Sequence, residues 1–128
     1  MRNPRKPILV AALSVGLLLS AAAQAEPKLV SSTPADGSTV EAPAKVELRF
    51  SEKLQAQHSG AKIIMTEMAG MAHAEPMGVK ARVSASSDPN VMLITPASPL
   101  TSGTYRIDWR AGGAEGQPAK GAVTFKVK

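Results

Sequence analysis

Short stretches of alternating apolar and polar residues, separated by turn-forming residues, follow one another along most of this chain. The clearest is residues 45–50, where Val46, Leu48 and Phe50 alternate with charged residues and would share one buried face of a strand. Residues 104–110 alternate in the same way through Tyr105 and Trp109. Seven strands are predicted in this manner, at residues 28–32, 45–50, 61–66, 79–83, 91–95, 104–110 and 122–128.

The spacing of these strands predicts the fold class. Turn signals such as Asp88-Pro89-Asn90 lie between them, and no stretch has helical periodicity. We therefore expect an all-β, seven-stranded antiparallel Greek-key sandwich or barrel. The run from Leu100 to Tyr105 is typical of a tyrosine corner, in which the tyrosine hydroxyl bonds back to the backbone.

The first 25 residues have the pattern of a secretory signal peptide. Three basic residues precede an apolar run over residues 8–23, which ends in the small-residue pattern Ala23-Gln24-Ala25. The run is shorter than the about 20 apolar residues of a membrane-spanning helix. We expect cleavage after Ala25, so that residues 26–128 form a single exported domain, in the periplasm, with no membrane span after cleavage.

Charge and cysteine content narrow the possible functions. Three of the 15 basic residues and none of the 10 acidic residues fall in the expected signal peptide, so its removal lowers the net charge from +5 to +2. The remaining basic residues are scattered singly, whereas nucleic-acid binders concentrate them in a stripe, so nucleic acid is not expected as a partner. Without cysteine, the domain has no disulfides and must hold any metal without thiolate.

Methionine is concentrated in one segment, which suggests a metal site. Four of the six methionines, Met65, Met68, Met71 and Met77, lie close together, with His73 between two of them. Most of the other residues between them are Gly, Ala and Pro, which favour an irregular loop over a packed element. Thioether is a soft, neutral donor that suits Cu(I), and imidazole is an acceptable companion once it is neutral.

Two of these residues have a simpler alternative interpretation. Met65 ends an apolar strand and is equally well explained as a side chain that fills the core. His73 alone would be read as a solvated side chain, and only its position between sulfurs makes it a candidate ligand. His58 has no sulfur neighbour and is predicted to be an ordinary surface residue.

Several motifs together resemble the periplasmic copper-resistance proteins of the CopC/PcoC family over nearly all of residues 26–128. The resemblance rests on Pro27 to Pro34, Phe50-Ser51-Glu52, Ser59 to Lys62, the Met/His segment, Ile94-Thr95-Pro96, and Leu100 through Tyr105 to Arg110. It implies a β-sandwich of cupredoxin-like or immunoglobulin-like form that buffers or carries copper in the periplasm. It also implies a Cu(I) site built from Met65, Met68, Met71, His73 and Met77, copper-handling proteins of the periplasm or inner membrane as partners, and no catalysis.

The Cu(II) site of that family is only partly present in this chain. The family uses an N-terminal histidine, a carboxylate after the Phe-Ser pair and a late Asp-x-His loop. The corresponding positions are Glu26, Glu52, Glu115 and Gln117. Because Cu(II) prefers nitrogen-rich tetragonal sites, we expect this degenerate site to bind it weakly or not at all, and the protein to prefer Cu(I). The carboxylates are otherwise explained as solvated surface groups.

Two other functions were weighed against copper carriage. An oxidative copper enzyme would need a histidine at the mature N-terminus, where Glu26 is predicted, so no catalytic residue is assigned. A protein-interaction module would use the methionine segment as an adaptable apolar docking patch. That second alternative remains open at the level of the sequence.

Overall fold

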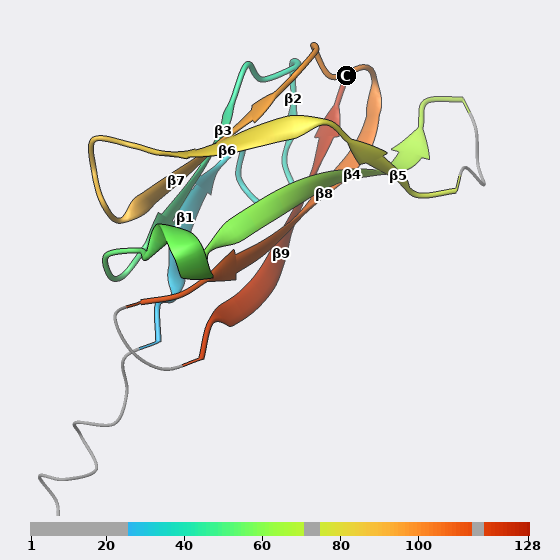
Figure 1. Cartoon of the computed structure of the whole chain (residues 1–128). Helices are drawn as coiled ribbons and strands as arrows, with labels where there is room; N and C mark the ends of the chain where they lie inside the picture. The colour runs from blue at the N-terminus through green and yellow to red at the C-terminus, as the bar shows by residue number, and fades with distance from the viewer. Residues whose placement is uncertain (1–25, 71–74, 114–116) are drawn as a thin grey trace, which may run out of the picture.

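The computed structural model describes residues 26–70, 75–113 and 117–128, and within them the regular secondary structure is almost entirely strand (Figure 1). One short 3-10 helix, η1 (Ala56–His58), follows the third strand. The strands are β1 Leu29–Thr33, β2 Thr39–Val40, β3 Val46–Phe50, β4 Gly60–Met68, β5 Met77–Val79, β6 Ala81–Ala85, β7 Val91–Pro96, β8 Gly103–Ala111 and β9 Ala119–Val127.

These strands form two sheets that pack face to face as a sandwich. One sheet has the order β1-β3-β7-β6, and the other has the order β2-β9-β8-β4-β5. All pairs are antiparallel except β2 with β9, which are parallel. Over the described ranges both sheets are open, so the structure is a sandwich and not a closed barrel. The all-β sandwich predicted from the sequence is therefore confirmed.

Alternation along the strands produces the core between the sheets. Val46, Leu48 and Phe50 of β3 are 0%, 0% and 2% exposed, as their spacing predicts. On β8 the inward residues include Tyr105 and Trp109, and the Trp109 and Phe50 rings pack in a T-shaped arrangement, with ring centroids 5.1 Å apart and planes at 72°. An aromatic pair of this kind stabilises the packing beyond the apolar area that it buries, and this pair joins the two sheets.

The tyrosine corner is also confirmed. The Tyr105 hydroxyl donates a 2.6 Å hydrogen bond to the backbone carbonyl of Thr101, and the Tyr105 side chain is only 1% exposed. A buried phenol needs such a partner because an unpaired hydroxyl in the core would cost free energy. The bond fixes the connection between β7 and β8 against the sheet that carries the methionines.

Among the described residues nine strands are present where seven were predicted, and the differences have physical reasons. The predicted strand at residues 79–83 is in fact two strands, because the chain leaves β5 in one sheet at Val79 and enters β6 in the other sheet at Ala81. The two-residue strand β2 is too short to produce a pattern. Strand β4 continues to Met68, past its predicted end, through an irregularity in register between Met65 and Glu67.

Across the described part of the chain, no helix is long and apolar enough to cross a membrane.

Candidate metal centre

Two of the predicted ligands, Met65 and Met77, face each other across a strand pair. Strands β4 and β5 are antiparallel neighbours, and their register places Met65 directly opposite Met77. Directly opposite residues project from the same face of a sheet, with Cβ atoms about 5 Å apart. Met65 is 7% exposed and Met77 is 51% exposed. The pair therefore extends from the core to the surface at the edge of the sandwich.

Met65 does fill the core, as one of the two interpretations of this residue predicted. It belongs to the buried cluster and lines a small hollow of about 210 Å³ together with Leu100 and Tyr105. Its position opposite Met77 nevertheless leaves its thioether beside an exposed one. Burial and a role as a ligand are therefore compatible for this residue, and its role as a ligand stays a prediction.

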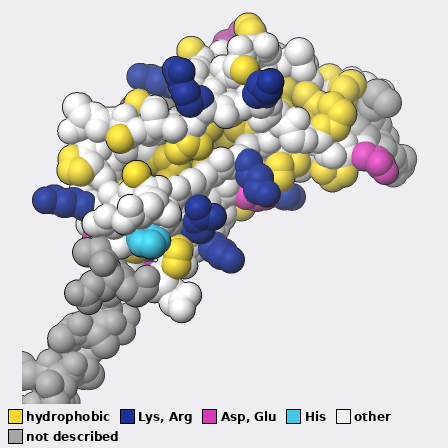
Figure 2. All heavy atoms as spheres, viewed as in Figure 1, with side chains coloured by type: hydrophobic (Ala, Val, Ile, Leu, Met, Phe, Trp, Pro, Cys, Tyr) yellow, Lys and Arg dark blue, Asp and Glu magenta, His cyan; other side chains and the backbone are white. Residues whose placement is uncertain are grey.

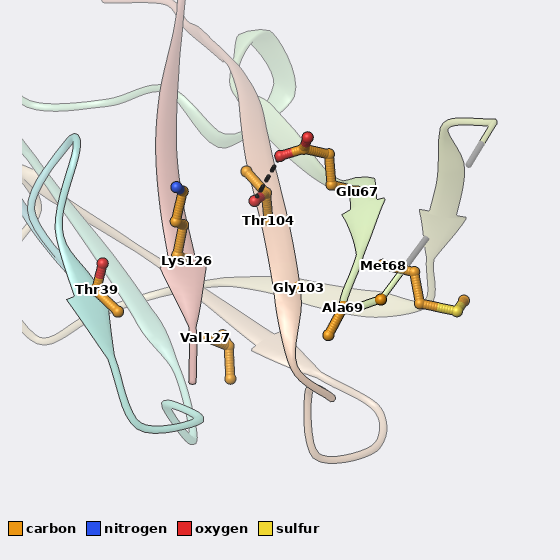
Figure 3. Close-up of a pocket in the computed structure, with 9 residues that line it drawn as sticks. Thr39, Glu67, Met68, Ala69, Gly103, Thr104, Lys126 and Val127 are labelled. Atoms are coloured by element: carbon orange, nitrogen blue, oxygen red, sulfur yellow. Dashed lines mark hydrogen bonds between the residues drawn. The ribbon is translucent and has the colours of Figure 1, made fainter. Parts of the chain in front are cut away.

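Met68 lies at the end of β4, opposite Gly103 of β8, and is 36% exposed. Adjacent residues on a strand project to opposite faces, so Glu67 and Met68 diverge. The Glu67 carboxylate accepts a 3.0 Å hydrogen bond from the Thr104 hydroxyl. Figure 3 shows the Met68 side chain pointing away from Lys126 and Val127, on the side of the hairpin that joins β4 to β5.

The backbone at Gly103 lets β8 approach β4 closely next to Met68. Gly103 has φ +157°, and a Cβ at this position would overlap the carbonyl oxygen of Glu67 and lie 3.5 Å from the Cα of Met68. Only glycine fits such an approach without displacement. Close backbone packing at Gly103 thus adds to the Glu67–Thr104 hydrogen bond in holding the end of β4 that carries Met68.

The remaining predicted ligands fall, in the sequence, between β4 and β5. Gly70 begins the turn of this hairpin with φ +83°, in the left-handed region. Met71 and His73 lie outside the described residues. Met68 and Met77 occupy the two ends of this connection, and Figure 2 shows hydrophobic side chains gathered over this end of the molecule. Three thioethers, one buried and two exposed, therefore lie at the base of the hairpin.

Of the residues expected to form a degenerate Cu(II) site, the described ones, Glu26, Glu52 and Gln117, belong to the opposite end of the sandwich (Figure 1). The N–H of Lys28 donates to the Ser51 hydroxyl (2.9 Å) and the N–H of Ser51 donates to the Lys28 carbonyl (2.8 Å). These bonds tie the segment after Glu26 to the segment before Glu52. Glu26 and Gln117 are exposed and Glu52 is half-buried, while Glu115 lies outside the described residues. Within residues 26–70, 75–113 and 117–128, no three His, Asp or Glu side chains converge as a metal site.

His58 is exposed, as predicted, but its position was not foreseen. It ends η1 and packs on Gly112, where an added Cβ would overlap the His58 Cβ. The N–H of Gln55 donates to the Gly112 carbonyl at 2.8 Å, which fixes η1 against the start of the connection between β8 and β9. In the sequence, only the glycine at position 112 indicates this contact. Glycine occurs for many structural reasons, so its presence alone does not predict the contact.

The fold and this geometry define a class of small β-sandwich with a methionine-rich hairpin at one end. Residues 29–128 match the CopC domain family, and the chain belongs to that family.

Named relatives agree with the assignment. The chain is 61% identical to copper resistance protein C of Pseudomonas syringae pv. tomato over 93% of this chain and 94% of that protein. It is 47% identical to copper resistance protein C of Escherichia coli over 96% of each. A crystal structure of PcoC, described as a methionine-rich copper resistance protein from Escherichia coli, superposes with a TM-score of 0.76 at 47% identity, covering 81% of this chain and all of that one.

Proposed function

We propose that this protein binds copper in the periplasm and buffers or carries it as part of copper resistance. The observation that carries the proposal is the placement of Met65 opposite Met77, with Met68 three residues further along β4 in the same hairpin. The names of the relatives support the link to copper resistance. The periplasmic location rests on the signal-peptide pattern of residues 1–25, which would leave residues 26–128 as the mature domain.

The preferred ion in this proposal is Cu(I), held by three or four donors chosen from Met65, Met68, Met71, His73 and Met77. Thioethers are neutral and soft, so they bind Cu(I) without having to release a proton. The exposure of Met68 and Met77 supports carriage, because an acceptor protein can reach these sulfurs and replace them one at a time. The partners would be copper-handling proteins of the periplasm or inner membrane.

Cu(II) has no comparable set of donors in this account. Glu26, Glu52, Glu115 and Gln117 supply oxygen and amide groups, while Cu(II) favours nitrogen-rich tetragonal coordination. We therefore assign Cu(II) at most a weak site at this end of the sandwich. No catalytic residue is assigned, and carriage of the ion does not require one.

The test is a titration of the processed protein with Cu(I) against a competing chelator under reducing conditions. We expect a one-to-one complex that weakens at least about tenfold when Met68 and Met71 are both changed to Leu, because leucine keeps the bulk and removes the sulfur. Met92→Leu is the matched control, since Met92 is 3% exposed on β7 in the other sheet. No complex, or a complex unaffected by the double change, rejects the proposal.

A second function is favoured by one specific observation, the exposure of Met68 (36%) and Met77 (51%). An exposed methionine surface can serve as an adaptable docking patch for a protein partner. The same leucine variants separate the two functions. A docking patch would tolerate Met→Leu and bind its partner without metal, whereas a Cu(I) site would lose the ion.

A further inference from the structure

A shallow basic hollow lies on the outer face of the five-stranded sheet, away from the methionines. Outward residues of β4, β8 and β9 alternate with the buried ones, and at one end of these strands they include Lys62, Arg110 and Lys120. These three line a hollow of about 420 Å³ whose lining also includes Gly60, Asp108 and Trp109.

Two of the basic residues of this hollow are cross-strand neighbours of like charge. Arg110 lies directly opposite Lys120 in the β8–β9 register, and both are exposed. Like charges directly opposite one another on neighbouring strands destabilise a sheet. An arrangement that is unfavourable in the free protein becomes favourable once a negatively charged group lies between the two side chains.

The one carboxylate in the hollow is already engaged. Lys62 lies opposite Asp108, but the Asp108 oxygens accept hydrogen bonds from Arg106, at 2.7 Å from Nε and 3.2 Å from Nη2. In the described part of the chain, none of Lys62, Arg110 and Lys120 makes a salt bridge. Three cationic groups therefore remain available to a ligand.

The shape of the hollow suits an inserted carboxylate. Gly60 has no side chain, and the Arg110 guanidinium extends towards it, with Nη2 3.5 Å from where a Cβ of residue 60 would lie. A guanidinium presents paired N–H donors that match the two oxygens of a carboxylate. The two lysines add compact charges at the sides of the hollow.

We propose that this hollow is the docking site for an acidic segment of a partner protein, a short run of Asp or Glu side chains. A membrane surface is a poorer fit, because anionic lipid headgroups form a broad layer that is matched by a broad basic face, and this site is concave and contains Asp108. The site goes beyond copper binding and does not depend on which residues hold the ion.

The location of the hollow gives it a role. Strand β4 runs from Gly60 at the hollow to Met68 at the methionine hairpin, about 26 Å at about 3.3 Å per residue. A partner held at the hollow therefore leaves the hairpin uncovered. The protein can then be tethered to a partner while its copper ligands remain accessible to exchange.

The experiment measures binding of a fluorescent decaglutamate peptide to the metal-free processed protein at low salt, with a decaglutamine peptide as the probe control. The test variant is K62Q/R110Q/K120Q. The matched control is K45Q/K80Q/R82Q, which also removes two lysines and one arginine, but from exposed positions outside the hollow. Circular dichroism and urea unfolding establish that both variants are folded.

We expect salt-sensitive binding of decaglutamate that falls at least about tenfold in the test variant and less than about twofold in the control variant. Equal losses in the two variants overturn the proposal, because they would reflect net charge alone. Absence of peptide binding also overturns it. Binding to phosphatidylglycerol vesicles without binding to the peptide would replace the acidic protein segment with a lipid surface.

Discussion

Met65 of β4 lies directly opposite Met77 of β5, so a buried thioether and an exposed one project from the same face of the sheet. This relationship joins the core of the sandwich to the proposed copper site. The buried partner has a fixed position because it packs against Leu100 and Tyr105. The exposed partner is the thioether that, under the proposed function, another protein would reach to take the ion.

Changing Met65 and Met77 one at a time distinguishes an effect on the free energy of unfolding from an effect on Cu(I) affinity. Met77→Leu is expected to lower Cu(I) affinity while changing the free energy of unfolding by less than about 0.5 kcal/mol, because Met77 is half-exposed. Met65→Leu is expected to lower Cu(I) affinity and also to change stability, by up to about 1.5 kcal/mol, because it alters a packed core at similar volume.

Chelator competition and urea unfolding measure the two quantities on the same samples. Met92→Leu serves as the reference for a core methionine outside the site, and it should alter stability alone. If Met65→Leu left Cu(I) affinity at the wild-type value, Met65 would be a core residue and not a ligand.

The close approach at Gly103 predicts a sensitive position beside the site. Gly103→Ala is expected to destabilise the fold by about 1–3 kcal/mol, because φ is +157° and the new Cβ would overlap the Glu67 carbonyl. Gly78→Ala is the matched control on β5, where an added Cβ meets nothing within 4 Å. Denaturant unfolding measures both, and equal stability of the two variants would show that β4 and β8 separate at little cost.

The tyrosine corner predicts that removing the Tyr105 hydroxyl lowers the free energy of unfolding. Tyr105→Phe deletes the 2.6 Å bond to the Thr101 carbonyl and leaves that oxygen without this donor, while the ring stays buried. The expected loss of unfolding free energy is about 1–2 kcal/mol. Urea denaturation at neutral pH measures it. If the Tyr105→Phe protein were as stable as the wild type, the tyrosine corner would not stabilise the fold.

Asp88 supplies a pH-dependent contribution to stability. Two hydrogen bonds hold the pKa of the Asp88 carboxyl below its ordinary value of 3.8. The larger effect comes from the backbone N–H of Asn90, and the next from the Arg49 guanidinium. A lowered pKa stabilises the fold above the unfolded value, and that contribution is lost as pH falls through the folded value.

Carboxyl NMR titration of the folded protein measures this effect directly. Arg49→Gln should move the pKa of Asp88 only part of the way back, since the Asn90 bond remains. A titration midpoint at the ordinary value in the wild type, or complete reversal in Arg49→Gln, would contradict the assigned causes.

The sequence predicted those parts of the fold in which local pattern and burial coincide. Val46, Leu48 and Phe50 alternate with charges, and all three are buried as expected. The same pattern could not reveal that the chain changes sheets between Val79 and Ala81, because an apolar strand residue looks alike in either sheet.

The candidate site was likewise predictable from the sequence only in part. Residue chemistry singled out the methionines and offered core filling as one interpretation of Met65. It could not tell that the exposed Met77 lies directly opposite this buried residue, since that depends on strand register. The packing of His58 on Gly112 and the facing of Arg110 and Lys120 also arise from pairing between distant segments. Such pairings leave no trace in short-range spacing.

The most direct test of the central claim is X-ray absorption at the copper edge of the processed protein loaded anaerobically with Cu(I). The account predicts sulfur neighbours around the ion, and fewer of them when Met68 and Met77 are changed to Leu. A coordination shell of nitrogen and oxygen alone, or a sulfur shell unchanged in those variants, would contradict it.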